Sequence, residues 1–533
     1  MKKLKAILAA CMALTMLVGC GGGKTSTDGL KFTYTFEAPP KSLDSTVATD
    51  GTSFTCIAAF VEGLMMKDEK GNLYPAIAED YDFNEETLTY TFKIRKDAKW
   101  DDGTDVTAHD FVYAWQRILR NGEEYGYMFG NGGANILNGQ EISEGKMDAD
   151  KLGATALDDK TLEVKLAAPC GYFLDLMNFA VFYPQNQAFV EKVGEDKYAT
   201  SPETTLACGP FKVTEYVPGQ NKVVYAKNET YWDADKVQLD ELEISSVKAD
   251  SATMGFETGD YDFVNIGYEL VDKYKDNDAY YSYPAGYQYY LAFNFHNEAL
   301  QNINIRKALS LALNRDDIAN NVLKDGSLAA VALDPQGLSF KDGVDFTDGM
   351  NYLSYDLEEA QKCFDQGLKE LGVSSITLEL LYGNDEAPCD ALATYALDAL
   401  GKLNGLTLTN RTEPKASRLD DMTADKFEIC VTRWGPDYAD PNTYLSLFDP
   451  VANMSNTNYQ NDTYKDLLNK IAVETDVDVR WDLMKEAEKV LMEDYACAPM
   501  LVKAGVALMN PEFTGIGLYP TGPNCYKYVT KVK

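Results

Sequence analysis

Strand-like and helix-like segments alternate along this chain of 533 residues once the first thirty positions are passed. Leu88–Ile94 has larger apolar side chains at every second position, and Asn84–Glu86 just before it suits a hairpin connection. Ile305–Leu313, which we expect Asn314 to end, and residues 479–494 carry apolar side chains at helical spacing instead. A chain this long exceeds what one hydrophobic core can organise, so the pattern predicts an α/β protein of two or three lobes.

Two helices carry further signals at their ends or along one face. Thr107 is a suitable N-cap for a helix over Phe111–Leu119, and Asp110 adds a favourable negative charge to its first turn. The helix at 479–494 has four apolar side chains on one face: Trp481, Met484, Ala487 and Leu491. We expect this stripe to pack in the core rather than hold a cofactor.

The N-terminus has the pattern of an export signal. Three lysines precede an apolar run at residues 6–19, which is short for a membrane span but suits a signal-peptide core. The run ends in Leu-Val-Gly before Cys20, and this ending resembles a bacterial lipobox. We therefore predict a lipoprotein signal peptide at 1–19, diacylation of Cys20 and a flexible tether at 20–29.

The chain is strongly acidic. Its formal net charge of −34 becomes −37 without residues 1–19, which hold three lysines and no acid. Such a surface repels nucleic acid and anionic lipid head groups, so we expect no nucleic-acid binding and only a covalent or inserted membrane attachment. The 34 tyrosines suit broad, adaptable recognition, although most would also pack well on sheet faces.

The cysteines give no metal or redox motif. Of the ten cysteines, Cys11 lies in the predicted signal peptide and Cys20 would carry lipid, which leaves eight. No two of these form a C-x-x-C pair, so a zinc ribbon or a dithiol redox motif is not indicated. The eight thiols could pair outside the cell in about 105 ways, or stay reduced, and the sequence leaves both open.

Catalysis and metal binding have little support. His109 and His296 are the two histidines, and neither belongs to an H-E-x-x-H pattern. Carboxylate pairs can serve a glycosidase, but 83 acidic residues make such pairs common by chance. The Asp-rich stretch at 341–349 departs in its spacing from a calcium-binding loop. We expect no enzymatic activity, no metal and no cofactor.

The stretch RWGPDYADP, at 433–441, is an unusual end for a strand. Phe427, Ile429 and Val431 before it alternate as in a half-buried strand, and Gly-Pro then breaks the pattern. An aspartate beside aromatic side chains, on a loop that leaves a buried strand, could pair with a cation in a dry site. We predict that Asp437 lines a cleft and meets a positive charge on a ligand; the alternative is a turn-forming aspartate after proline.

Several longer stretches resemble one family. Residues 88–108 read LTYTFKIRKDAKWDDGTDVTA, and HDFVYAWQRIL follows them. This resembles the signature of the solute-binding proteins of peptide ABC importers, and of their oligopeptide-binding members in particular. Further matches stand in the family's order: SLD at 42–44, ACGPFKVTEY at 207–216, NETYWDADK at 228–236 and the stretch at 289–318. The resemblance covers nearly the whole chain after Cys20.

The resemblance implies a periplasmic-binding-protein-like type II fold, with two hinged α/β lobes and an additional domain inserted in the first lobe. On this chain, lobe I would comprise residues 30–60, 184–290 and 508–533, the inserted domain 61–183, and lobe II 291–507. A peptide would lie extended between the lobes. Its backbone would pair with strand edges, which makes binding largely indifferent to side-chain identity.

The resemblance also assigns roles to residues in the stretch at 433–441. The family meets the peptide's α-ammonium with an aspartate, and the matching position here is Asp437. Trp434 and Gly435 stand where the family has cleft-wall residues, although Trp434 is also consistent with a plain core residue. The glycine departs from the larger side chain of oligopeptide receptors, which leaves pocket size and peptide length open.

Other candidates come from both lobes and from the hinge. Either Arg433 or Arg411 would meet a ligand carboxylate, and Phe293 and Asn294 would pair with the peptide backbone near the hinge. The first lobe would add five residues, of which Asp50 is equally consistent with a solvated loop position. These are Thr49, Asp50, Gly51, Tyr125 and Tyr127.

The function implied is that of a lipid-anchored substrate-binding component of an ABC transporter. It would sit on the extracellular or periplasmic face of a bacterial cell membrane, act as a monomer, capture oligopeptides by closure of its lobes and deliver them to the permease subunits. Other cargo of the family stays open, namely dipeptides, murein peptides, haem, nickel complexes or signalling peptides. A surface hydrolase is the alternative from another class.

Overall fold

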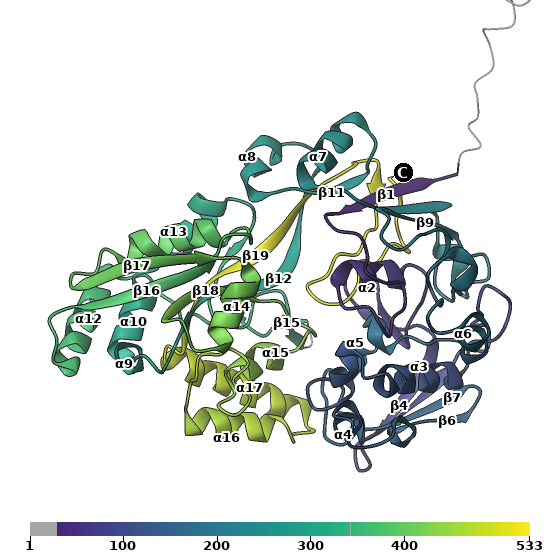
Figure 1. The fold of residues 1–533 in the computed structure, drawn as a ribbon, viewed down its shortest axis with the longest axis horizontal. Helices are drawn as coiled ribbons and strands as arrows, with labels where there is room; N and C mark the ends of the chain where they lie inside the picture. Colours follow the sequence, from purple (N-terminus) through teal and green to yellow (C-terminus); the bar gives the residue numbers. More distant parts are fainter. Residues whose placement is uncertain (1–28, 342, 533) are drawn as a thin grey trace, which may run out of the picture.

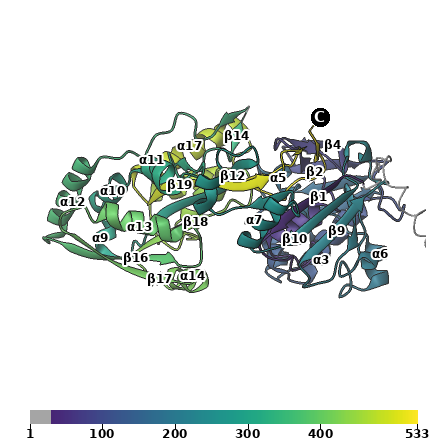
Figure 2. The same cartoon turned by 90° about the horizontal axis from the view of Figure 1, so that it is seen from above.

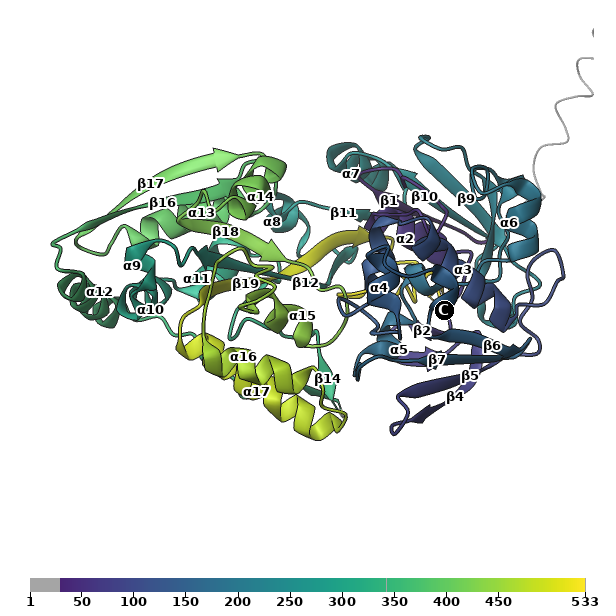
Figure 3. The same cartoon turned by 60° about the horizontal axis from the view of Figure 1, so that its bottom comes forward.

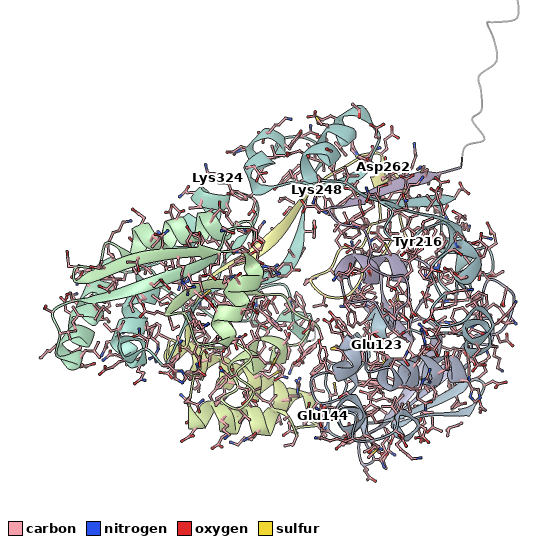
Figure 4. The ribbon with its side chains drawn as sticks, viewed as in Figure 1. Glu123, Glu144, Tyr216, Lys248, Asp262 and Lys324 are labelled. Atoms are coloured by element: carbon pink, nitrogen blue, oxygen red, sulfur yellow. The ribbon has the colours of Figure 1, made fainter. Side chains whose placement is uncertain are left out.

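A computed structural model of the protein describes residues 29–341 and 343–532. The predicted lipidation site Cys20, the signal peptide at 1–19 and the tether up to residue 28 lie outside the described residues. Two lobes lie side by side and are joined by long strands (Figure 1). Side chains fill both lobes, with Glu123 and Tyr216 marking the first and Lys324 the second (Figure 4).

One eleven-stranded sheet runs through both lobes. In spatial order its strands are β17 (Leu406–Glu413), β16 (Ile376–Gly383), β18 (Ile429–Trp434), β12 (Tyr280–Phe293), β19 (Cys497–Met509), β11 (Phe263–Asn265), β1 (Lys31–Phe36), β10 (Glu241–Ser246), β9 (Lys222–Lys227) and β8 (Phe211–Glu215), and β13 (Leu328–Ala329) pairs beside β19. β1 runs parallel to β10 and β11, and β16 runs parallel to β17 and β18. The other neighbours are antiparallel.

The lobes are connected through β12 and β19, which have 14 and 13 residues. β19 pairs with β11 of the first lobe and β12 pairs with β18 of the second, so both strands cross from one lobe to the other (Figure 2). Their pairing shifts register between Pro284 and Tyr287. Gly286, in this interval, has φ +72°, and an added Cβ would lie 2.7 Å from the Cβ of Pro520. A break in the ladder between two lobes is what a hinge requires.

The first lobe combines its part of the large sheet with a four-stranded antiparallel sheet. The latter has the order β4 (Ala78–Asn84), β5 (Thr89–Ile94), β7 (Thr161–Lys165) and β6 (Ala154–Asp158). Helices α2 (Gly51–Ala58) and α3 (Ala108–Arg120) pack with both sheets in one continuous apolar core. The predicted hairpin and the Thr107-capped helix are confirmed, and Asp110 completes a capping box.

The second lobe covers its part of the sheet on both faces. Helices α10 (Ile303–Leu311), α12 (Leu357–Leu371) and α13 (Cys389–Leu400) pack on one face. The other face packs against α14 (Lys415–Thr423), α15 (Asn442–Leu445), α16 (Asp462–Ile471) and α17 (Val477–Glu493), of which α16 and α17 lie together in Figure 3. Because of this double cover, Cys430 and Thr432 of β18 are buried as well as Ile429 and Val431. The expectation, from the alternation, that only one face of this strand is buried is therefore wrong.

The predicted helices of the second lobe are present with one change at an end. α10 stops at Leu311, three residues before Asn314, because the Asn314 side chain caps the next helix, α11 (Arg315–Asp317). α17 matches the helix expected at 479–494. Its Met484, Ala487 and Leu491 side chains are buried in the core, with Trp481 packed at the edge.

Shorter elements complete the described chain. The helices are α4 (Gly139–Ser143), α5 (Phe173–Leu176), α6 (Gln187–Val193), α7 (Ala249–Thr258), α8 (Val271–Tyr274) and α9 (Glu298–Gln301). The strands are β2 (Met65–Lys67), β3 (Leu73–Pro75), β14 (Phe340–Lys341), β15 (Val344–Asp345), β20 (Phe513–Thr514) and β21 (Thr530–Lys531). Across residues 29–341 and 343–532, no helix combines the length and apolar character that crossing a bilayer demands.

The cysteines of the described chain are all buried, with free thiols. The pairing that the sequence left open is therefore absent among these residues. Burial raises the pKa of the Cys56 thiol to about 12 and that of Cys430 to about 11, so both remain protonated and unreactive.

Candidate functional site

A cavity of about 650 Å³ lies between the two lobes. The first lobe contributes the start of α2, aromatic side chains and the segment 520–523; the second contributes the adjoining parts of β12 and β18, helix α14 and the segment 454–456. Seven of the residues singled out from the sequence line it: Thr49, Gly51, Tyr125, Arg433, Trp434, Gly435 and Asp437.

Asp437 lies on the loop that leaves β18, and its side chain reaches water within the cavity. Its N–H donates to Thr443 Oγ1 at 3.4 Å. No lysine or arginine in the described part of the chain forms an ion pair with its carboxylate. Its position between the lobes removes much of the surrounding water, and this desolvation raises the pKa of Asp437 to about 6. A positive group brought into the cavity would stabilise the ionised carboxylate.

The wall beside Asp437 is built around the ring of Tyr287. The guanidinium of Arg433 lies over this ring, 4.2 Å from its centroid. An added Cβ on Gly435 would lie 2.3 Å from a ring carbon, so only glycine fits there. Trp434 donates from Nε1 to Thr443 Oγ1 at 3.4 Å and packs partly against the core, so it serves both the wall and the interior. The glycine that departs from the family pattern thus makes room for Tyr287.

A positively charged cluster occupies another part of the same cavity. The Glu386 carboxylate lies 2.9 Å from Arg418, 3.3 Å from Arg433 and 3.4 Å from Lys415. Burial alone would raise the pKa of Glu386, but the three cations bring it below its usual value. Three cations share one carboxylate, so this wall carries excess positive charge that can attract a ligand carboxylate.

The first-lobe candidates have different roles. Asp50 caps α2: its carboxylate accepts from the N–H of Ser53 at 2.9 Å and from its hydroxyl at 2.6 Å, and it does not line the cavity. Tyr125 does line it, and burial together with the charge of Asp437 raises its pKa to about 12. Tyr127 packs beside Tyr125, with ring centroids 5.8 Å apart, but its ring is not part of the cavity lining.

Three other candidates lie away from the cavity. Phe293 pairs with Ile429 at the C-terminal end of β12 and is fully buried, three residues or roughly 10 Å along the strand from Tyr290, which lines the cavity. Asn294, which is also buried, donates to the carbonyl of Phe427 at 2.9 Å. Arg411 forms ion pairs with three carboxylates outside the cavity: Glu379, Glu413 and Asp421.

Several lining residues were not among the candidates predicted from the sequence. They include Glu386, Lys415 and Arg418 of the charged cluster, Tyr287 and Tyr290 of β12, and the segment 520–523. The tyrosine-rich run at 280–290 was a usable signal for aromatic side chains at the lobe junction, although strand alternation places Tyr287 and Tyr290 on opposite faces. Lys415 and Arg418 had no such signal, because only the tertiary packing of α14 brings them beside Glu386 and Arg433.

Two α/β lobes, a two-strand connection and a cavity between the lobes with opposite charges in its walls define a two-lobed ligand-binding protein of the type II class. The sequence pattern of the bacterial extracellular solute-binding proteins, family 5, matches residues 72–456. The chain belongs to this family.

Relatives align over almost their whole lengths. The chain is 33% identical to the dipeptide-binding protein of Lactococcus lactis, over 98% of both chains. The structure of Listeria monocytogenes OppA bound to peptide matches with a TM-score of 0.74 and 33% identity, over 95% of this chain and 100% of that one. The murein tripeptide-binding protein MppA in its unliganded open form matches with a TM-score of 0.80 and 26% identity, over 95% and 98%. The higher score with an open form agrees with the water-accessible cavity seen here.

Proposed function

We propose that this chain captures short peptides between its lobes and delivers them to the permease of an ABC importer. The observation that carries the proposal is the Asp437 carboxylate, which lies in the cavity with a raised pKa and with no cation of the described chain paired to it. The α-ammonium of a peptide is the complementary group. Relatives named for dipeptide and oligopeptide binding support this cargo class, and both lengths stay within the proposal.

The opposite end of such a peptide would approach the cationic cluster. Arg433 and Lys415, which are partly accessible, would attract its carboxylate, while Arg418 is buried behind them. Trp434, Gly435, Gly51 and Tyr125 would form the walls along its length. Binding to both lobes would favour the closed form, and closure would present the protein to the permease.

The proposal also includes the anchor. Diacylated Cys20 would hold the protein as a monomer on the outer face of the cell membrane, and the segment 20–29 would serve as a tether. The protein would act as a binding protein and not as an enzyme. The division into lobe I (30–60, 184–290, 508–533), inserted domain (61–183) and lobe II (291–507) remains part of the proposal.

Native mass spectrometry of protein purified without denaturation tests the function. The expected result is a series of masses that exceed the empty protein by those of short peptides. An empty protein that cleaves added peptides or glycans would contradict the proposal and favour a hydrolase.

A further inference from the structure

The two lobes touch at a second place, away from the strands that join them. Tyr172, just before α5 of the first lobe, stacks on Tyr438, which lies on the loop after β18 of the second lobe. The ring centroids are 3.8 Å apart, and the ring planes meet at an angle of 3°. Both rings are buried, and Tyr438 packs in the core of the first lobe. Figure 1 shows α5 and α15 facing each other across this junction, below the crossing strands β12 and β19.

Polar groups add two further contacts between the lobes. The N–H of Ala439 donates to Asp175 Oδ2 at 3.2 Å, and Lys67 of the first lobe lies 2.7 Å from the other oxygen of Asp175. The guanidinium of Arg480, on α17, lies 5.9 Å from the centroid of the Tyr172 ring. The second lobe therefore contacts the start of α5 through a ring, a backbone N–H and a guanidinium. We call these three contacts the interlobe latch.

Space between the lobes lies on both sides of the interlobe latch. The main cavity reaches Asp437, the residue before Tyr438. A second cavity, of about 390 Å³, is lined by Tyr172 and Ala439 among others. Tyr172, Asp175 and Tyr438 do not line the main cavity. A few side chains therefore carry this contact, and a ligand in the main cavity can bind without touching them.

We propose that the interlobe latch holds the lobes at a fixed separation without help from a ligand and so prearranges the main cavity for binding. Each of its contacts joins two groups of the protein, so none of them needs a ligand to form. A ligand that must contact both lobes binds the latched form, and its apparent dissociation constant is the intrinsic one divided by the latched fraction. The effect on affinity rests on the proposed function, whereas the effect on lobe separation does not.

Two first-lobe variants open the interlobe latch in different ways. Tyr172→Ala removes one ring of the stack. Gly171→Leu keeps both rings but forces a side chain against Arg480, because an added Cβ at Gly171 already lies 2.9 Å from Nη1 of that arginine. Small-angle X-ray scattering without peptide measures lobe separation, and we expect a larger radius of gyration in both variants than in the wild type. Tyr172→Phe is the matched control, since it keeps a flat ring in the stack and should keep the wild-type radius.

Calorimetry with trialanine and pentaalanine measures the consequence for binding. Both peptides should bind the two opening variants about tenfold more weakly than the wild type, and by the same factor, because the latch contacts neither peptide. A saturating amount of either peptide should return the variants to the wild-type radius. Thermal melting checks the fold of each variant, and Gly171→Leu carries the test if loss of the buried ring prevents folding.

The outcomes for the latch and for the proposed function are separate. A folded Tyr172→Ala protein with the wild-type radius and affinity would overturn the latch and leave the proposed function standing. A loss of affinity for only one of the two peptides would also overturn it, since that result would place the ring at the ligand. A wild type that binds neither peptide would overturn the proposed function, and the scattering of the two variants would still decide the latch.

Discussion

Two charged regions of the same cavity are built in opposite ways. At one, Asp437 has no cationic partner in the described chain, and desolvation raises its pKa to about 6. At the other, Glu386 lies within reach of Arg418, Arg433 and Lys415, and its pKa is lowered. The same chemical group thus serves two purposes. Glu386 holds cations together within the protein, whereas Asp437 retains a charge that no lysine or arginine of the described chain neutralises.

The largest expected effect comes from removing the unpaired charge. Asp437→Ala should weaken binding of a free-amine peptide by at least tenfold, because the peptide ammonium would be enclosed between the lobes without its anionic partner. Calorimetry measures the loss, and Asp437→Asn, which keeps the shape, is the control for packing. The same affinity in wild type and both variants would remove Asp437 from the site.

The next effect concerns folding, at the other region. Glu386→Gln leaves Arg418, which is 1% exposed, without its anionic partner. We expect the free energy of unfolding to fall by about 3 kcal/mol, measured by urea titration. We expect the opposite sign for Asp437→Asn, because this variant removes an unpaired charge whose pKa is raised and should slightly stabilise the ligand-free protein. Two variants of equal stability would break the contrast.

A pH titration of binding is expected to give a smaller change. A peptide ammonium binds the ionised form of Asp437, whose pKa is about 6. Affinity should therefore fall about tenfold between pH 7 and pH 5, and it should be flat over this range in Asp437→Asn. Without ligand the sign is reversed for the stability that Asp437 contributes: because its pKa is raised in the folded protein, this contribution is present at low pH and is lost as pH rises through 6. Isothermal titrations and melting curves across this range check both slopes.

The smallest effect is expected from a single cation of the cluster. Arg433→Gln should weaken binding only a few-fold, because Lys415 and Arg418 still carry positive charge and the exposed part of the site is screened by water. A peptide with an amidated carboxyl end should not distinguish the variant from the wild type. An effect on the amidated peptide as large as on the free acid would assign Arg433 to packing against Tyr287 instead.

Much of the fold followed from local sequence patterns. The alternation at 88–94 and the Thr107 cap describe elements whose contacts are close in the chain, and both predictions are confirmed. The burial of β18 on both faces could not be predicted in this way. It depends on tertiary packing against helices from other parts of the chain, with α10, α12 and α13 on one face and α14 to α17 on the other. Periodicity reports which residues alternate, not how many layers cover them.

The residues of the site also fall into those that the sequence could predict and those that it could not. Asp437, Trp434, Gly435 and Arg433 lie on one continuous segment, so the sequence placed them together, and the structure has them lining one cavity. Phe293 was predicted at the ligand but is buried at the C-terminal end of β12, three residues beyond Tyr290 and outside the cavity lining, since the strand positions that reach the cavity depend on a register that the sequence does not display. Glu386 could not be found, because its partners come from α14 and β18.

The most decisive measurement is a crystal structure of the protein with a bound peptide. We expect the peptide's leading nitrogen at about 2.7–2.9 Å from an oxygen of Asp437, with no cation of the protein nearer to that carboxylate. A peptide whose amino end is held elsewhere, with Asp437 facing bulk water, would contradict it.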